Sequence, residues 1–591
     1  MTTLDPRLDG AETELLQAVS ADELMAFTAQ IAEEVRLSGS PEELRAIQRA
    51  EAQLSAWGFR TRLLHHDGYI SLPGAARLEI DGLGALTCIT HAFAVSTPPD
   101  GLRGEIVDVG AGAEDDWARA EVRGRIALVD GLATPDMARR ANAAGSIAQI
   151  FVNDEHLHEM ILSPVWGSPT PEQRDRYPRT PAVSITQQDG ARLRDALASR
   201  PHAAHMCATV ETGWQALPLL EAHLPGTEEP EDFVLFAGHI DSWHYGAMDN
   251  GSANATMLHV ARLLAERRQQ LRRGLRVCFW SGHSHGRYAG SAWYVDHHWH
   301  ELRQHCAAYV NIDSVGGQGA TMLSEGYCMA ETFDLGKALI ERYGGQQYNG
   351  SRVGRSGDES LVGVGVPSLL MTVSEQPPTA GATGAASVIG GRSGGLGWWW
   401  HTPADTLDKL DPELLARDAR LYAATLFRLC AEPILPFDYA AGAAELDHFV
   451  ADYQQIADGR FDLSPARERT QALRREAAAL QDALETLRRR ETEQAAEPTA
   501  LAAINQALMA LGRATIPLNY TAAGPFGHDP ALGMPPLPLL ADVRRLAASA
   551  PNSDEARFIN VGLQRNLNQL VYGLDAAVES VAHARAVAES A

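Results

Sequence analysis

The sequence predicts an α/β protein in which a mostly parallel sheet is joined to an inserted β-rich segment and a C-terminal helical segment. Three changes of pattern along the chain support this prediction. In residues 206–440, short apolar runs alternate with amphipathic helical stretches, which is typical of a parallel sheet. Residues 80–205 contain short strand-like runs between glycines and prolines. Residues 441–591 have mostly the apolar spacing of helices.

The N-terminal segment and the β-rich segment are expected to differ in secondary structure. Residues 1 to about 75 have helical spacing, as in "ELLQAVSADELMAFTAQIAEEV" and "PEELRAIQRAEAQLSAWG". We expect residues 1–79 to complete the α/β domain. In residues 80–205, the runs "GRIALVDG" and "SIAQIFVN" are apolar, rich in β-branched residues and bounded by turn residues, as in strands.

The α/β segment and the helical segment follow in order. Strands are expected at "FVLFAGHIDSW", "LRVCFW", "AAYVNID" and "VPSLLMTV". Between the first two lies "NGSANATMLHVARLLAERRQQLRRG", a predicted helix that ends at Gly274. Beyond residue 440, "SPARERTQALRREAAALQDALETLRRRETEQ" and the C-terminal stretch are predicted to form long helices.

Composition limits the functions that the chain can have. Its 591 residues are enough for several domains. The net charge of −25 argues against a nucleic-acid partner and against an anionic membrane surface. No stretch approaches the roughly 18–20 apolar residues of a membrane span, and the N-terminus lacks the pattern of a signal peptide. The six cysteines form no CxxC pair, which is typical of reduced thiols, so a cytoplasmic location is expected.

Imidazoles and carboxylates gather just after the predicted strands. In open α/β sheets, ligands bind at the carboxyl ends of the strands, so these side chains are expected to converge there and to form a metal site. The His-x-Asp pattern fits, because a ligating imidazole needs an acceptor for its other N–H group. The residues concerned are His239, Asp241, Asp249, His283, Ser284, His285, Asp313 and His401.

These motifs resemble those of a known family. The series "GHIDSWHYGAMDNGSANA", "FWSGH", "GSAWY", "AYVNIDS" and "HTPADT" is similar to that of the zinc aminopeptidase and glutamate carboxypeptidase family of co-catalytic metallopeptidases, of which the transferrin receptor is a metal-free relative. The resemblance covers nearly the whole chain. It implies a metallopeptidase-like domain, a protease-associated domain at residues 80–205 and a helical domain at residues 441–591 that forms a homodimer.

Carried over residue by residue, the resemblance implies four metal ligands and one partner. The ligands are His239, Asp249, which bridges two metals in the family, Asp313 and His401. Asp241 matches the residue that orients the first of them.

The chain departs from the family at one motif. The family has two adjacent glutamates after the "FW" strand, a general base followed by a metal ligand. Counting from Trp280 puts His283 and Ser284 at these positions, whereas counting back from "GS" at residues 290–291 puts Ser284 and His285 there. Either way, both glutamates are missing. We expect His283 to act as the base beside Ser284, since the strand fixes its distance from Trp280, and His285 to be a further metal ligand.

The missing glutamates also affect the predicted metal. Only two carboxylate ligands remain, so one divalent ion is electrostatically easier to hold than two. A site rich in imidazole suits transition metals, with zinc favoured and iron or manganese as alternatives. We therefore expect one or two divalent transition metals.

Three functions remain open. The first is a metal-dependent hydrolase of an amide-type C–N bond in a small molecule or peptide, with a histidine replacing the glutamate base. The second is a lyase or an iron-dependent enzyme on the same scaffold, and the third is a non-catalytic binding protein. The retained ligands argue against the third, and the missing glutamates argue against an ordinary peptidase. Predicted substrate-binding residues are Arg287, Tyr288, Arg355, Asp358, Glu359 and Trp400.

Overall fold

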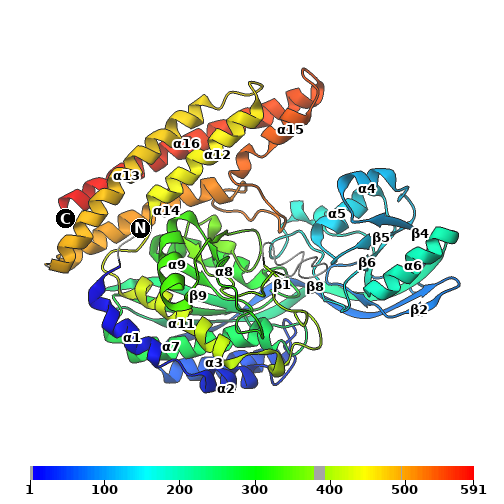
Figure 1. The fold of residues 1–591 in the computed structure, drawn as a ribbon, viewed down its shortest axis with the longest axis horizontal. Helices are drawn as coiled ribbons and strands as arrows, with labels where there is room; N and C mark the ends of the chain where they lie inside the picture. Colours follow the sequence, from blue (N-terminus) through cyan, green and yellow to red (C-terminus); the bar gives the residue numbers. More distant parts are fainter. Residues whose placement is uncertain (1–3, 379–392, 494–495) are drawn as a thin grey trace.

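The computed structural model describes residues 4–378, 393–493 and 496–591. A central α/β part lies between a β-rich part and a layer of long helices (Figure 1). In chain order, the β-rich part is inserted into the α/β part, and the long helices come last. This is the architecture that the sequence predicts.

The central sheet is built around three parallel strands. β9 (Glu229–His239) lies between β10 (Arg273–Trp280) and β11 (Cys306–Asn311) and runs parallel to both. β14 (Ser368–Leu369) pairs in parallel with β11. Because the strands point the same way, their carboxyl ends meet at one edge of the sheet, and the loops that follow them lie together.

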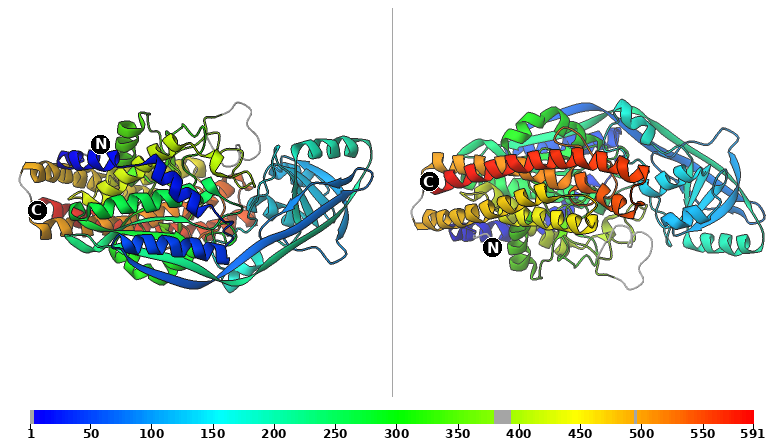
Figure 2. Two further views of the ribbon diagram at one scale, coloured as in Figure 1. Left: turned by 90° about the horizontal axis from the view of Figure 1, so that it is seen from below. Right: turned by 90° about the horizontal axis from the view of Figure 1, so that it is seen from above.

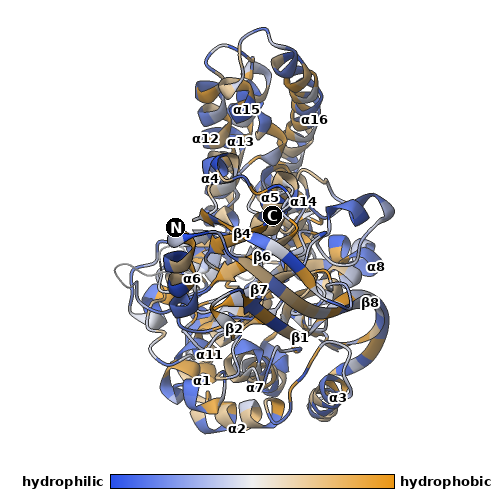
Figure 3. Cartoon of the chain, turned by 90° about the vertical axis from the view of Figure 1, so that its right-hand side faces the viewer, coloured by the Kyte–Doolittle hydropathy of each residue, from blue (hydrophilic) through white to orange (hydrophobic). Residues whose placement is uncertain are grey.

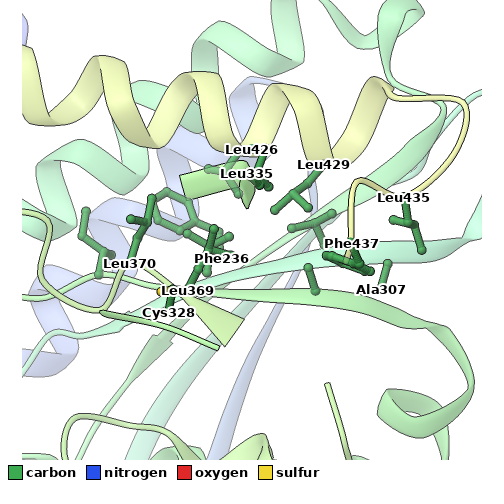
Figure 4. Close-up of a cluster of buried hydrophobic side chains, with 14 of the residues drawn as sticks. Phe236, Ala307, Cys328, Leu335, Leu369, Leu370, Leu426, Leu429, Leu435 and Phe437 are labelled. Carbon is green, nitrogen blue, oxygen red and sulfur yellow. The ribbon is translucent and has the colours of Figure 1, made fainter. Parts of the chain in front are cut away.

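The two faces of the central sheet are buried by different helices. Val234 and Phe236 of β9 belong to the core that includes α11 (Pro412–Ala431), and Phe233 and Leu235 pack with α8 (Ala289–His305). This alternation is the period of a strand that is buried on both faces. Leu426 and Leu429 of α11 lie over Phe236 and Ala307 (Figure 4). Other helices of the same core are α1 (Asp9–Gln17), α2 (Ala21–Ile31), α3 (Pro41–Ala56), α7 (Ala253–Glu266) and α9 (Phe333–Leu339).

A long antiparallel ribbon joins the central sheet to the β-rich part. β8 (Ala203–Leu224) pairs with β10 at one end and with β4 (Leu102–Gly110) at the other, and β1 (Arg60–Ile80) pairs along β8 (Figure 1). The predicted helix up to about residue 75 is therefore wrong beyond α3. Gly68 and Pro73 are poor helix formers, and pairing with a strand far along the chain overrides local spacing.

The β-rich part has its own parallel sheet and its own core. β4, β5, β6 and β7 follow one another in parallel, and β3 (Ile89–Thr90) closes the edge antiparallel to β7. Separate apolar clusters lie on the two faces of this sheet. The bounds of its other strands are β5 (Ile126–Asp130), β6 (Ala148–Val152) and β7 (Ala182–Ile185). Its helices are α4 (Glu114–Arg119), α5 (Pro135–Ala144) and α6 (Gln187–Ser199).

The C-terminal helices form a layer against the α/β part (Figure 2). Hydrophilic and hydrophobic residues both occur along these helices (Figure 3), as expected for helices that pack by one side. None of the helices in the described ranges is long and apolar enough to cross a membrane. The helices are α12 (Tyr439–Ala457), α13 (Ser464–Glu493), α14 (Pro498–Tyr520), α15 (Asp542–Ala548) and α16 (Asp554–Ser590).

One predicted boundary in the central part is also wrong. The helix predicted to stop at Gly274 ends as α7 at Glu266, and Gly274 lies inside β10. A Cβ at Gly274 would come within 2.8 Å of the carbonyl oxygen of Leu224 on β8, so close strand packing accounts for this glycine.

Candidate metal centre

The loops after the central strands are tied together by a buried amide. Asn250 Nδ2 donates to the carbonyl oxygens of His239, at 3.1 Å, and Ile312, at 3.3 Å. Its Oδ1 accepts from the backbone N–H of Ser314 at 3.0 Å. One side chain therefore fixes the ends of β9 and β11 relative to each other, which is why residues 73 positions apart, such as His239 and Ile312, stay in register.

Asp249 lies between two of the predicted metal-binding imidazoles. Its Oδ1 is 3.1 Å from His239 Nε2, and its Oδ2 is 3.0 Å from His401 Nε2. Asp313 Oδ1 is 3.4 Å from the same His239 nitrogen. The four residues that the sequence predicts as ligands thus lie close together, with the carboxylate of Asp249 between the two imidazoles.

Backbone carbonyl oxygens orient two of these imidazoles. His239 Nδ1 donates to the carbonyl oxygen of Asp241 at 2.9 Å, and His401 Nδ1 donates to that of Glu159 at 2.6 Å. A carbonyl oxygen can only accept, so both Nδ1 atoms carry a proton, and a neutral ring then offers its Nε2 lone pair to the centre. Asp241 was predicted to orient His239 by its carboxylate, but that group is farther away, at 3.6 Å.

His283 joins this cluster. One possible ligand atom from each of His239, His283 and Asp313 lies within 4.8 Å of the others. The rings of His239 and His283 stack with centroids 3.8 Å apart. His283 Nδ1 lies 2.8 Å from Asp358 Oδ2, so the carboxylate holds this ring in the orientation in which Nε2 is free.

Asp358 therefore has a different place from the predicted one. It was expected to line the substrate pocket, but it is buried and is the hydrogen-bond partner of His283. Its other oxygen accepts from Ser291 Oγ at 2.7 Å. Glu359 was also expected in the pocket. It is buried against Ser368 Oγ, at 2.9 Å, and burial raises the pKa of its carboxyl to about 8, so its predicted substrate contact is not supported.

The carboxylate of Asp241 shapes the loop that carries the two histidines. It accepts from the backbone N–H groups of Ser284, at 2.8 Å, and His283, at 3.3 Å, and from Ser38 Oγ at 2.5 Å. Burial raises the pKa of this carboxyl, but the imidazole of His239, together with those of His283 and His285, holds it well below its usual range. Ser284 is buried, and no side-chain contact supports its predicted catalytic role.

His285 lies on another side of this loop. Its Nδ1 is 2.9 Å from Ser38 Oγ. The ring centroids of His285 and Trp243 are 4.4 Å apart, and those of Trp243 and His401 are 5.7 Å apart. Burial lowers the pKa of His285 to about 4. The two histidines of the loop thus diverge. His283 lies beside His239, whereas the ligand role predicted for His285 stays a prediction.

The predicted substrate-binding arginines lie near Tyr288, whose ring contacts that of His283. The Tyr288 ring is 5.0 Å from the His283 ring, and the guanidinium of Arg287 is 5.1 Å from the Tyr288 ring. Arg287 donates to the carbonyl oxygen of Ala531 at 3.3 Å, and Arg355 lies over Trp166. The loop around residue 530 therefore borders this side of the centre, although it belongs to the helical segment.

Several supporting residues were not predicted. Asp405 accepts from the backbone N–H groups of Met248, at 2.8 Å, and Asp249, at 3.0 Å, and burial raises its pKa to about 7. The buried Arg36 donates to the carbonyl oxygens of Ile240, at 2.9 Å, and Gly246, at 3.1 Å. Asp405 lies within the "HTPADT" motif, which was a usable signal, whereas Arg36 and Ser38 lie in an N-terminal stretch without one.

Two segments of the chain match known protein families. Residues 220–426 match peptidase family M28, and residues 101–193 match the PA domain. A probable glutamate carboxypeptidase of Zea mays is 24% identical over 509 residues, which are 73% of this chain and 69% of that protein.

Solved structures share the fold. The M28 peptidase precursor of Shewanella amazonensis superposes with a TM-score of 0.57 at 21% identity, over 72% of this chain and 97% of that one. A zinc aminopeptidase of Bacillus subtilis gives a TM-score of 0.53 at 20% identity, over 69% and 95% of the two chains. By these matches, the chain is similar to the M28 peptidases over residues 220–426 and to the PA domain over residues 101–193.

Proposed function

We propose that the protein is a metal-dependent hydrolase of amide-type C–N bonds in peptides or small molecules, in which His283 replaces the missing glutamate base. One observation carries the metal dependence. Within the part of the chain that the structure describes, His239 Nε2 and Asp249 Oδ1 are buried 3.1 Å apart, and neither meets the geometry of a hydrogen bond with any partner. Buried polar atoms rarely remain unpaired, and a cation between them would satisfy both.

The donor set fits a transition metal. His239, Asp249, Asp313 and His401 would hold it, and two imidazoles with two carboxylates suit zinc, with iron or manganese as alternatives. A bound zinc ion would supply Lewis-acid polarisation of the scissile carbonyl.

His283 is placed to accept a proton. Its Nδ1 is engaged by Asp358, which fixes the ring and stabilises the imidazolium that forms when the other nitrogen takes up a proton. Ser291 Oγ donates to the second oxygen of Asp358 and so holds that carboxylate in turn. An imidazole suits this role, because its ordinary pKa lies near neutral pH.

The substrate side of the proposal rests on two cations. Arg287 and Arg355 have no carboxylate within 4 Å among the residues that the structure describes, and they donate to the carbonyl oxygens of Ala531 and Asp529, respectively. Their charges are therefore not neutralised by ion pairs, and we propose that they and Tyr288 face the substrate.

The helical segment is proposed to form a homodimer. Phe558 and Tyr572 of α16 are 73% and 80% exposed, and Val561 is 55% exposed. Phe558 and Tyr572 are about four turns of 3.6 residues apart, so they lie on the same side of the helix. Exposed aromatic residues on one side of a helix are typical of an interaction surface.

Metal affinity should rise with pH. Burial lowers the pKa of His239, but the carboxylate of Asp313, followed by those of Asp241 and Asp249, raises it well above its ordinary value. Without metal, the raised pKa means that a proton competes with the metal for His239 Nε2. We expect zinc affinity to increase about tenfold per pH unit from pH 6 to pH 8, as measured by competition with a chromophoric chelator. An affinity that does not change with pH would contradict this assignment.

His283→Ala should lower turnover and leave metal bound. Loss of a general base typically costs roughly 10²–10⁴-fold in rate. The test measures hydrolysis of a panel of dipeptides and aminoacyl amides, together with zinc content. His448→Ala, whose side chain is 67% exposed on α12, is the control. Unchanged turnover in His283→Ala would refute the proposal, and loss of zinc would make His283 a ligand and not the base.

The dimer is tested by mass in solution. Light scattering should give twice the chain mass of 63.8 kDa, and Phe558→Asp with Tyr572→Asp should reduce it to 63.8 kDa, because buried charges disfavour the interface. A wild-type mass of 63.8 kDa at micromolar concentration would show that the proposal is wrong.

A further inference from the structure

The last predicted metal ligand is held by a segment of the β-rich part. Glu159 and His401 exchange two hydrogen bonds: the Glu159 backbone N–H donates to the His401 carbonyl oxygen at 2.9 Å, and His401 Nδ1 donates to the Glu159 carbonyl oxygen at 2.6 Å. Beside them, His158 Nδ1 donates to the carbonyl oxygen of Trp400 at 2.6 Å. We call residues 156–159 and 398–401, with these bonds, the clasp.

His158 is fixed to the β-rich part. Its side chain is fully buried, and its backbone N–H donates to Asn153 Oδ1 at 3.1 Å. Asn153 follows β6 directly, and its Nδ2 donates to the carbonyl oxygen of Gly131 and to Ser184 Oγ. The imidazole of His158 therefore has little freedom, and the position of its Nδ1 is set by the sheet of the β-rich part.

The three tryptophans before His401 complete the clasp. The Trp398 ring stacks on His156 at 4.3 Å, and Trp399 Nε1 lies 3.2 Å from Met248 Sδ, next to Asp249 in the chain. The Trp400 ring stacks on that of His401 at 3.4 Å and 14°. The stacked Trp400 ring and the hydrogen bond at Nδ1 restrict rotation of the His401 ring. Each of the three consecutive tryptophans thus makes a contact at or near the metal centre.

The backbone at His401 requires such support. Its φ is +58°, a left-handed conformation that residues other than glycine rarely adopt. Conformations of this kind are strained and persist where surrounding contacts impose them. Here the contacts on both sides of the residue, at the Trp400 carbonyl and at the His401 carbonyl and ring, come from the clasp.

We propose that His158 is a positioning residue of the metal centre: by holding the Trp400 carbonyl oxygen, it sets the orientation in which His401 Nε2 faces Asp249. It acts through His401, because its imidazole is bonded to the Trp400 carbonyl oxygen and not to Asp249. The β-rich part is then a component of the metal site and not only a neighbour of it. This inference rests on the proposed metal dependence.

The test compares three variants of the full chain. His158→Leu removes the donor at similar volume, and His158→Asn keeps an N–H donor near the Nδ1 position. His202→Leu is the matched control, because His202 is also buried in the β-rich part and lies 2.7 Å from a carbonyl oxygen, that of Asp81, away from the centre. Zinc affinity is measured by chelator competition, and thermal unfolding is measured with and without zinc.

We expect His158→Leu to weaken zinc binding by roughly 10–100-fold, as for other residues that orient metal ligands, and to reduce the rise in Tm that zinc produces. His158→Asn should recover most of both. His202→Leu should lower Tm equally with and without zinc and leave affinity unchanged. A role in stability alone would not change the zinc-dependent rise in Tm.

Two results would overturn this inference and leave the proposed function intact. One is wild-type zinc affinity in His158→Leu, and the other is an equal loss of zinc affinity in His158→Leu and His158→Asn. A wild-type protein that binds no zinc would overturn the proposed function, and this inference with it.

Discussion

The site depends on a buried carboxylate placed between two imidazoles. Asp249 is 6% exposed, and its oxygens lie 3.1 and 3.0 Å from His239 Nε2 and His401 Nε2. Burying a charge costs on the order of several kcal/mol, because water no longer solvates it, unless cations or hydrogen bonds compensate. The surrounding structure supplies this compensation by orienting each imidazole from behind. The acceptors behind them differ, being the carbonyl oxygens of Asp241 and Glu159.

These acceptors come from separate parts of the chain. The parallel strands bring His239 and Asp313 to one edge of the sheet, and the ribbon of β1 and β8 carries the β-rich part alongside, so that Glu159 can reach His401 (Figure 1). In the proposed function, the two glutamates of the resembled family are missing, which leaves less negative charge at this centre. The carboxylate of Asp358 supplies one negative charge near the centre, but it acts through His283, whose imidazole lies between Asp358 and the cluster.

Much of the fold and the convergence of the four candidate ligands could be predicted from the sequence, because strands that are buried on both faces show as apolar runs and these residues directly follow them. The strand over residues 60–80 could not, since its partner lies more than a hundred residues away and local spacing favoured a helix. The roles of Asp358 and Glu159 were missed for the same reason. Their contacts join segments that only the folded chain brings together.

X-ray absorption spectroscopy of the zinc-loaded protein tests the central claim, that imidazoles and carboxylates at the strand ends hold a metal ion. The account predicts a first shell of nitrogen and oxygen at about 2.0–2.2 Å, with outer-shell scattering from at least two imidazoles and no sulfur. A spectrum with sulfur ligands, without imidazole scattering, or from a protein that retains no zinc would contradict it.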